Sequence, residues 1–99
     1  MYKVINHPLI KEDMKKLNKS IQILVLKKLK QLSTSPELGK LLGNKNGINL
    51  SGLRKLYVAK KQVRIVYEII DDILVVKVIA IGKRESMEVY KEASQRSMD

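Results

Sequence analysis

Lysine, arginine and tyrosine residues that could act on a phosphodiester gather in the second half of this 99-residue chain. The group comprises Lys55, Tyr57, Arg64, Lys83, Arg84 and Tyr90. RNA can be cleaved by attack of a ribose 2′-OH on the adjacent phosphate. That reaction needs a base for the hydroxyl proton, cations for the charge on the phosphorane and an acid for the leaving 5′-oxygen. If these residues face RNA, they can fill all three roles without a metal ion or a nucleotide cofactor.

Other kinds of chemistry have little support in the sequence. His7 is the only histidine and stands beside a predicted helix start, which excludes a histidine pair and favours a structural role. The chain has no cysteine, so it has neither a disulfide nor a thiolate metal site. Asp71 and Asp72 are typical of a turn, and no acidic cluster recurs at metal-ligand spacing. We therefore expect no metal and no cofactor.

The charge balance indicates an anionic partner. The chain holds 20 Lys and Arg against 10 Asp and Glu, a formal net charge of +10. A charge of this size destabilises a small fold by self-repulsion unless a partner neutralises it. Nucleic acid is the first choice, and an acidic protein or a membrane surface is the alternative. The absence of cysteine and of a long apolar segment predicts a soluble, cytoplasmic protein.

The elements that would position these residues are predicted from hydrophobic periodicity. The segments 53–59, 62–70 and 73–81 alternate as strands, with short turns at Lys60-Lys61 and Asp71-Asp72, and should form an antiparallel meander. The last strand is apolar on both faces, which suits a central place beside a strand at residues 1–6. By alternation, Lys55, Tyr57 and Arg64 should line one groove together with the segment 84–90.

Two helices should form a hairpin packed on one face of this sheet. The first runs from Pro8 to Asn18, and the second follows a cap at Ser20. The buried stripe of the second helix is predicted to contain Ile21, Leu24, Val25, Leu29 and Leu32. Residues 37–50 should be a loop with one helical turn, a short helix should open at Gly82, and the tail 95–99 should fray. The whole chain, residues 1–99, should be one α+β domain with about four antiparallel strands.

Two stretches carry a family resemblance. V-R-I-V-Y-E-I-I-D-D, followed by I-L-V-V-K-V-I-A-I-G-K-R-E-S-M-E-V-Y, resembles the RelE toxins of the RelE/ParE toxin-antitoxin superfamily. The stretch L-x-G-L-R-K-L before the sheet agrees. The resemblance implies a RelE/ParE-like fold and a ribonuclease that cuts mRNA in the ribosomal A site, beside 16S rRNA, until a RelB-like antitoxin neutralises it.

The resemblance also implies roles for particular residues. Lys55, Arg64, Arg84 and Tyr90 match the catalytic positions of the family, and Lys83 adjoins them as an RNA-binding residue. Tyr57 stands where the family has a second lysine. Either Tyr57 or the turn lysines Lys60 and Lys61 then contact the RNA phosphate, and the general base is Lys55, Tyr57 or Tyr90.

Two other functions remain open. A ParE-like protein shares the fold and acts by binding DNA gyrase, without cleaving RNA. A diverged member would bind only antitoxin or RNA, and Tyr57 keeps that alternative open. In each case we expect an acidic or amphipathic antitoxin segment to bind, with Val66 and Ile70 as exposed apolar anchors beside Arg64.

Overall fold

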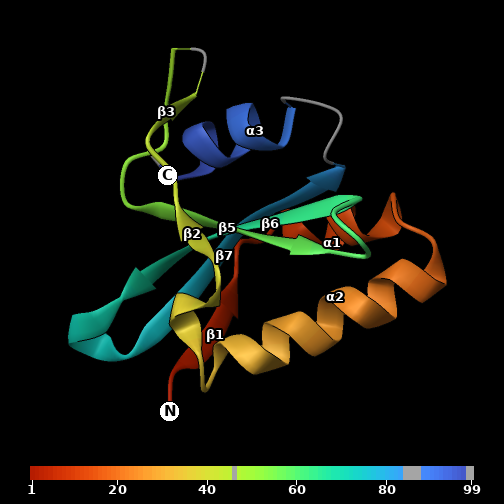
Figure 1. Cartoon of the computed structure of the whole chain (residues 1–99), viewed down its shortest axis with the longest axis horizontal. Coiled ribbons are helices and arrows are strands. Elements are labelled where there is room, and N and C mark those ends of the chain that lie inside the picture. Colours follow the sequence, from red (N-terminus) through yellow and green to blue (C-terminus); the bar gives the residue numbers. More distant parts are fainter. Residues whose placement is uncertain (46, 84–87, 98–99) are drawn as a thin grey trace.

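A five-stranded sheet forms the centre of the molecule, in the order β1-β7-β6-β5-β2 (Figure 1). The computed structural model describes residues 1–45, 47–83 and 88–97. The three long strands are antiparallel neighbours, as predicted. The strands are β1 (Lys3–Asn6), β2 (Lys40–Leu41), β5 (Leu53–Val58), β6 (Val63–Ile70) and β7 (Val75–Lys83). The predicted α+β class is therefore confirmed.

One strand pair departs from the predicted antiparallel sheet. β1 runs parallel to β7, with Lys3 opposite Val75 and Asn6 opposite Val78. Alternation within residues 1–6 indicates a strand but says nothing of its direction, which depends on how the following helices carry the chain across the sheet. The short edge strand β2 is the fifth strand, so the sheet is mixed.

The helical hairpin covers one face of the sheet. It consists of α1 (Ile10–Lys15) and α2 (Lys19–Leu32). Asn18 caps α2, since its Oδ1 accepts a hydrogen bond from Ile21 N at 2.9 Å, so the predicted cap at Ser20 is wrong. Leu24 is also misplaced in the predicted stripe, because it is 41% exposed. In the described part of the chain, no helix is long and apolar enough to cross a membrane. The first core joins the hairpin to the sheet through Ile10, Leu17, Val25, Leu29, Leu32, Val63, Ile65, Tyr67, Val76 and Val78.

A second core lies on the opposite face, beneath α3 (Glu88–Arg96). It contains Leu42, Leu50, Leu53, Val66, Ile79, Ala80, Val89, Tyr90 and Ala93. Cover on both faces explains why β7 is apolar on both of its sides. The predicted helix start at Gly82 is wrong: β7 continues through Lys83, which pairs with Val63. α3 begins at Glu88.

The segment predicted as a loop holds more structure than expected. It contains a 3₁₀ turn, η1 (Pro36–Leu38), then β2, then a small hairpin of β3 (Asn44–Lys45) and β4 (Ile48–Asn49). These strands are only two residues long, too short for a period to be visible in the sequence. Leu42 and Leu50 anchor the segment in the second core. A second 3₁₀ turn, η2 (Asp71–Ile73), forms the predicted turn between β6 and β7.

Candidate functional site

Three residues stand in register at one end of the sheet, on the face that α3 covers. Arg64 of β6 pairs with Tyr57 of β5 on one side and with Gly82 of β7 on the other. α3 comes close where Gly82 has no side chain: a Cβ on Gly82 would lie 3.0 Å from the Cβ of Val89. The next residue, Tyr90, places its ring centroid 4.6 Å from Arg64 Cζ. The ring centroid of Tyr57 is 5.8 Å from the same atom, so two tyrosines flank the guanidinium.

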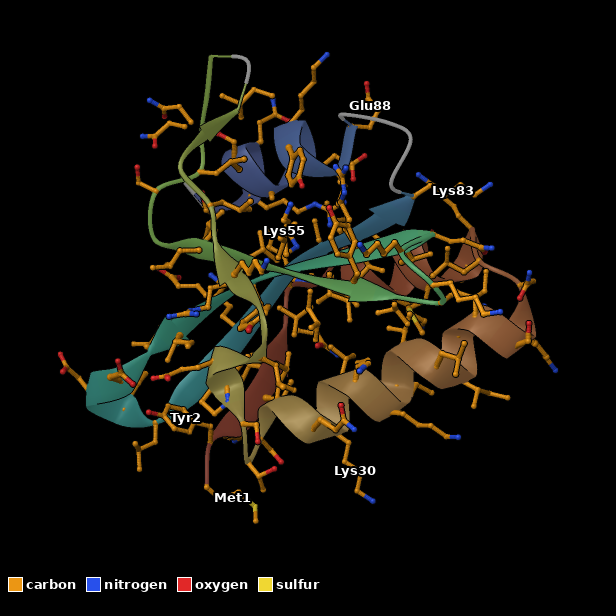
Figure 2. All side chains as sticks on the ribbon, viewed as in Figure 1. Met1, Tyr2, Lys30, Lys55, Lys83 and Glu88 are labelled. Carbon is orange, nitrogen blue, oxygen red and sulfur yellow. The ribbon has the colours of Figure 1, made fainter. Side chains whose placement is uncertain are left out.

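Tyr57 is the centre of a group of cations. Lys55 Nζ donates a hydrogen bond to Tyr57 Oη at 3.0 Å and lies 4.9 Å from the ring centroid. Lys61, in the turn after β5, has its Nζ 5.8 Å from the same centroid. Cations are attracted to an aromatic face, and a charged donor makes a stronger hydrogen bond than a neutral one. With Arg64, three positive groups surround one phenol. Figure 2 labels Lys55, which lies on β5.

Arg64 keeps part of its hydrogen-bonding capacity unused. Its Nε and Nη1 atoms are buried and have no hydrogen-bond partner among the described residues. Buried donors are normally paired, since an unpaired charged donor costs more than the 1–3 kcal/mol or so of a neutral one. The adjacent rings hold the guanidinium without using its N–H groups. Those N–H groups are therefore unused hydrogen-bond donors inside the site.

The structure brings together Lys55, Tyr57, Arg64 and Tyr90, the grouping that strand alternation predicted. Lys60 lies in the same turn as Lys61, exposed and in left-handed backbone with φ 55°. No described contact joins Lys60 to the cluster. Arg84 lies outside the described residues. The roles assigned to all of these residues stay predictions.

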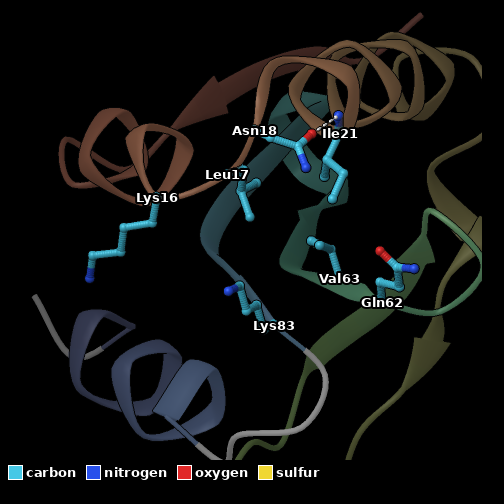
Figure 3. Close-up of a pocket in the computed structure, with 7 residues that line it drawn as sticks. All are labelled: Lys16, Leu17, Asn18, Ile21, Gln62, Val63 and Lys83. Atoms are coloured by element: carbon cyan, nitrogen blue, oxygen red, sulfur yellow. Dashed lines mark hydrogen bonds between the residues drawn. The ribbon is translucent and has the colours of Figure 1, made fainter.

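Lys83 faces the other side of the sheet from Arg64. It pairs with Val63, whose side chain belongs to the first core, whereas Arg64 pairs with Gly82. Lys83 lines a separate cavity of about 500 Å³ between the hairpin and the end of the sheet, together with Lys16 and Gln62 (Figure 3). Its predicted contact with RNA would therefore occur at that cavity.

Tyr90, a predicted catalytic residue, and Val66, a predicted exposed anchor, are both buried where α3 packs on the sheet. Tyr90 is 2% exposed, so in this conformation its ring contacts Arg64 and is not open for stacking on a base. Val66 is 0% exposed, so the prediction that it serves as an exposed anchor is wrong. Its neighbours in the second core include Val89 and Ala93 of α3. Ile70, beyond that cover, is half-buried.

A buried ion pair that the sequence analysis missed fixes α3 to the rest of the fold. Arg96 Nη1 donates to Asp13 Oδ2 at 2.7 Å, and Arg96 Nη2 donates to Asp13 Oδ1 at 3.1 Å. The same pair satisfies the edge of β7 beyond the end of β1: Ile81 N donates to Asp13 Oδ2, and Ile79 O accepts from Arg96 Nη1, both at 3.0 Å. The only signal was an aspartate beside the apolar stripe of the first helix. The predicted fraying at Arg96 is wrong.

The single histidine is buried and hydrogen-bonded, and the acidic side chains form no cluster of metal ligands among the described residues. His7 is buried, and its Nδ1 accepts a hydrogen bond from Leu9 N at 3.1 Å. Within residues 1–45, 47–83 and 88–97, no group of three His, Cys, Asp or Glu side chains could hold a metal ion. Whether the chemistry is independent of metal stays a prediction.

Comparison with known sequences identifies a family. The model of the ParE toxin of the type II toxin-antitoxin system parDE matches residues 4–87. A RelE-like toxin protein of Escherichia coli is 35% identical over 88 residues, which is 86% of this chain and 85% of that protein. The mRNA interferase toxin RelE of E. coli strain K12 is 36% identical over 87 residues, with the same two coverages.

Solved structures agree with this assignment. A mutant of E. coli toxin RelE in the free state aligns with a TM-score of 0.75 and 32% identity, covering 96% of each chain. A RelE mutant in complex with an antitoxin RelBc peptide aligns with a TM-score of 0.68 and 32% identity, covering 93% of each chain. The resemblance to RelE toxins is thus confirmed. The chain belongs to the ParE toxin family of type II toxin-antitoxin systems and is a RelE-type toxin.

Proposed function

We propose that this toxin is a metal-independent endoribonuclease that cleaves mRNA in the ribosomal A site. The observation that carries the proposal is the guanidinium of Arg64, which lies between two tyrosine rings with buried, unpaired N–H groups. The mRNA interferase name of the RelE relative supports it. The reaction is attack of a ribose 2′-OH on the adjacent phosphate.

Arg64 is assigned to the phosphate. Two N–H groups of one guanidinium can bind two non-bridging oxygens side by side. The charge on those oxygens grows as the phosphorane forms, so donors that are already fixed in place stabilise the transition state more than the ground state. Arg84 is assigned to the same phosphate on the resemblance alone, since it lies outside the described residues.

Tyr57 is assigned as the proton acceptor. Lys55 Nζ donates a hydrogen bond to Tyr57 Oη, so Lys55 supports this role as the donor that stabilises negative charge on the phenol oxygen. A bond forms between the 2′-oxygen and phosphorus as the bond from phosphorus to the 5′-oxygen breaks. Tyr57 takes the role of proton acceptor as a phenolate, the form that the surrounding cations stabilise. The 2′-OH proton passes to the phenolate Oη, and Lys61 supplies a proton to the leaving 5′-oxygen. The products are a 2′,3′-cyclic phosphate and a 5′-hydroxyl.

Tyr90 is assigned as a positioning residue. Its buried ring covers the Arg64 guanidinium, which fixes the direction of the N–H groups. The helix that carries it is fastened to α1 and β7 by Arg96. Tyr90 then acts on the RNA through Arg64.

Dependence on the ribosome follows from what the cluster contains. The cations and phenols of the cluster are suited to phosphate and ribose, and Arg64 and Lys55 are assigned to those groups and not to a base edge. The 2′-oxygen must also be brought in line with the phosphate, and a partner that bends the RNA can supply that orientation. We assign this role to the A site, with the charge of +10 attracting the toxin to 16S rRNA in the cytoplasm.

A RelB-like antitoxin is the proposed regulator. Solved relatives include a RelE mutant bound to a RelBc peptide and the intact E. coli RelBE toxin-antitoxin complex. The matched chain of that complex is 27% identical to this chain. An acidic or amphipathic segment would complement the net charge of this toxin.

Expression of the toxin, followed by mapping of mRNA ends, tests the proposal. We expect arrest of translation and cuts within translated codons that leave 5′-hydroxyl and 2′,3′-cyclic phosphate ends, with isolated RNA cut poorly. Arg64→Ala should lower the rate by on the order of 10²- to 10³-fold. The matched control is Lys30→Ala, which removes an exposed charge on α2 far from the cluster and should cut normally.

Three outcomes would overturn the proposal. Intact mRNA together with a loss of gyrase supercoiling activity would indicate the ParE-like function. Intact mRNA with normal gyrase would indicate a diverged, non-cleaving member. Ends with 5′-phosphate would indicate a different reaction, since attack by the 2′-OH always leaves a 5′-hydroxyl.

A further inference from the structure

A cavity of about 310 Å³ opens beside Tyr57, at the outer edge of β5. β2 pairs only with Arg54 and Lys55, so in the described part of the sheet the edge of β5 beyond Lys55 has no neighbouring strand. The size lies at the lower end of the range for small-ligand sites. The lining residues are Leu38, Lys40, Lys55, Leu56, Tyr57 and Lys61.

One wall of the cavity is fixed to the sheet. Gly39 N donates to Tyr67 Oη at 2.8 Å, and Tyr67 Oη donates to Pro36 O at 2.7 Å. Arg54 Nη1 donates to Gly39 O at 2.8 Å. Burial raises the pKa of Tyr67, so it remains a phenol that can donate this hydrogen bond at neutral pH. Residues 36–40 are therefore held in place before any ligand enters.

The lining combines apolar surface with positive charge. Leu38 is 47% exposed, although it adjoins a buried, hydrogen-bonded segment. Leu56 adds a second apolar side chain, and Tyr57 adds an aromatic ring. Lys40 and Lys61 are exposed lysines on the lining. A nucleotide has the matching parts, since its base is flat and largely apolar on its faces and its phosphate is anionic.

We propose that this cavity is a subsite for the nucleotide next to the scissile phosphate. The base lies against Leu38, Leu56 and the ring of Tyr57, and its outer phosphate meets Lys40, while Lys61 stays at the leaving oxygen of the reacting phosphate. The inference rests on the proposed ribonuclease function and adds a place where base identity influences cleavage. The cluster around Arg64 would bind the reacting phosphate, and this subsite would hold the neighbouring base.

Continuity favours a nucleotide over an apolar side chain of a protein partner. The cavity shares Lys55 and Tyr57 with the phosphate cluster, so an RNA chain bound at Arg64 passes its opening. An apolar side chain would fill the space near Leu38 but would leave three lysines without an anion. Such an occupant is tested as a separate outcome below.

The first experiment measures binding of a short RNA that cannot be cut. The probe is a trinucleotide with 2′-deoxyribose at the attacking position, titrated into the protein to millimolar concentration while the methyl signals of Leu38 are followed by NMR. We expect saturable shifts at Leu38. Leu38→Ala should weaken binding by roughly 5- to 50-fold, since the change removes three carbons and each buried carbon contributes at most the effect of one buried CH₂ group. The matched control Leu41→Ala removes a leucine that is 64% exposed on β2 but does not line the cavity, and should change nothing.

The second measurement couples the side chain to the base. The trinucleotide is made with an abasic site at each position in turn. At the position that occupies the cavity, removal of the base should weaken binding to the wild type, and Leu38→Ala should then cause no further loss. Additive losses at every position would overturn the subsite, as would an absence of shifts at Leu38. Shifts with an acidic peptide but not with RNA would assign the cavity to a protein partner.

Failure of the subsite and failure of the proposed function give different results. The binding measurements need no cleavage, so a wild type that binds as expected but leaves mRNA intact would disprove only the ribonuclease function. Conversely, a toxin that cuts on ribosomes with the same base preference in wild type and Leu38→Ala would disprove only the subsite.

Discussion

Removal of the Arg96 guanidinium tests how α3 is held. Arg96→Met keeps a long apolar stem and deletes the charged group that donates to Asp13, Ile79 and Glu92. The carboxylate of Asp13 then keeps the hydrogen bond from Ile81 N, in a position where the Asp13 side chain is only 3% exposed. A buried charge that has lost its partner strongly lowers the stability of the fold.

The expected cost is a large part of the stability of a domain of this size. Breaking a buried ion pair by removing one partner typically costs about 3–5 kcal/mol. A small domain is stable by about 5–15 kcal/mol in total. Since 1 kcal/mol shifts the melting temperature by about 4–8 °C at this length, Arg96→Met should lower it by on the order of 12–40 °C. Arg96→Met combined with Asp13→Leu replaces both charges by apolar groups and should recover part of the loss, because no charge is left unpaired but Ile81 N and Ile79 O lose these side-chain partners.

Urea unfolding followed by circular dichroism measures these free energies. The control is Lys15→Met, which removes an exposed ion pair with Glu12, at 3.6 Å, and should change stability by no more than about 1 kcal/mol. The reasoning is refuted if Arg96→Met costs no more than this control. It is also refuted if the double variant is as unstable as the sum of the single variants, because the two charges would then not be coupled.

Three further predictions concern the sheet and its site. Gly39→Ala should lower the free energy of unfolding by about 1–3 kcal/mol, because the added Cβ would lie 2.5 Å from a backbone oxygen and 2.7 Å from Tyr67 Oη. Gly43→Ala, with nothing within 4 Å, is the control for the same unfolding measurement. The free energy of unfolding should fall as the pH rises past about 10, since the Tyr67 phenol ionises there in the unfolded chain but keeps its proton in the fold, where burial raises its pKa. Urea unfolding of Tyr67→Phe at several alkaline pH values should show a flatter decline, and an unchanged slope would contradict the assignment. Single-turnover cleavage on programmed ribosomes should be near normal for Tyr90→Phe and slowed in Tyr90→Ala by about as much as in Arg64→Ala; a loss in Tyr90→Phe would show that the hydroxyl, not the ring, matters.

The sequence allowed prediction of those parts of the fold that depend on the alternation of residues along a strand. The alternation around Tyr57 and Arg64 places both side chains on one face, and a short antiparallel turn places the two strands side by side. The grouping of Lys55, Tyr57 and Arg64 follows from those two facts. The same reasoning failed for Val66. Its predicted face was right, but Val89 and Ala93 of α3 pack with it in the second core, and alternation along β6 carries no information about that cover.

Alternation along the sequence could not reveal the irregular position in β7. Along β7, Ala80 pairs with Val66 of β6, and Val78 pairs with Tyr67 of β6. Ile79, between them, therefore has no partner on β6 and is an extra residue in β7. A bulge of this kind breaks the alternation, and Ile79 and Ala80 both belong to the second core. Alternation counted along the whole strand therefore assigns the wrong face to residues on one side of the bulge.

Long-range polar contacts were equally invisible. Asp13 and Arg96 are 83 residues apart, and neither belongs to a motif. Their partners on β7 are backbone atoms at a bulge and beyond the end of β1. A backbone group that needs a side-chain partner can be recognised only when the ends of the strands are known, because an unpaired backbone group has no sequence signature.

The Asp13 to Arg96 contact also has a consequence for the order of synthesis. The first helix leaves the ribosome early, but its carboxylate must wait for the last turn of α3 before it meets its partner. Closing a loop of this length has an entropic cost that no local contact offsets until the chain end is present. Tyr90 docks over Arg64 with the same helix. In a nascent chain, or one that ends before Arg96, the strands of the sheet would therefore be complete before Tyr90 covers Arg64 and before Asp13 meets its partner.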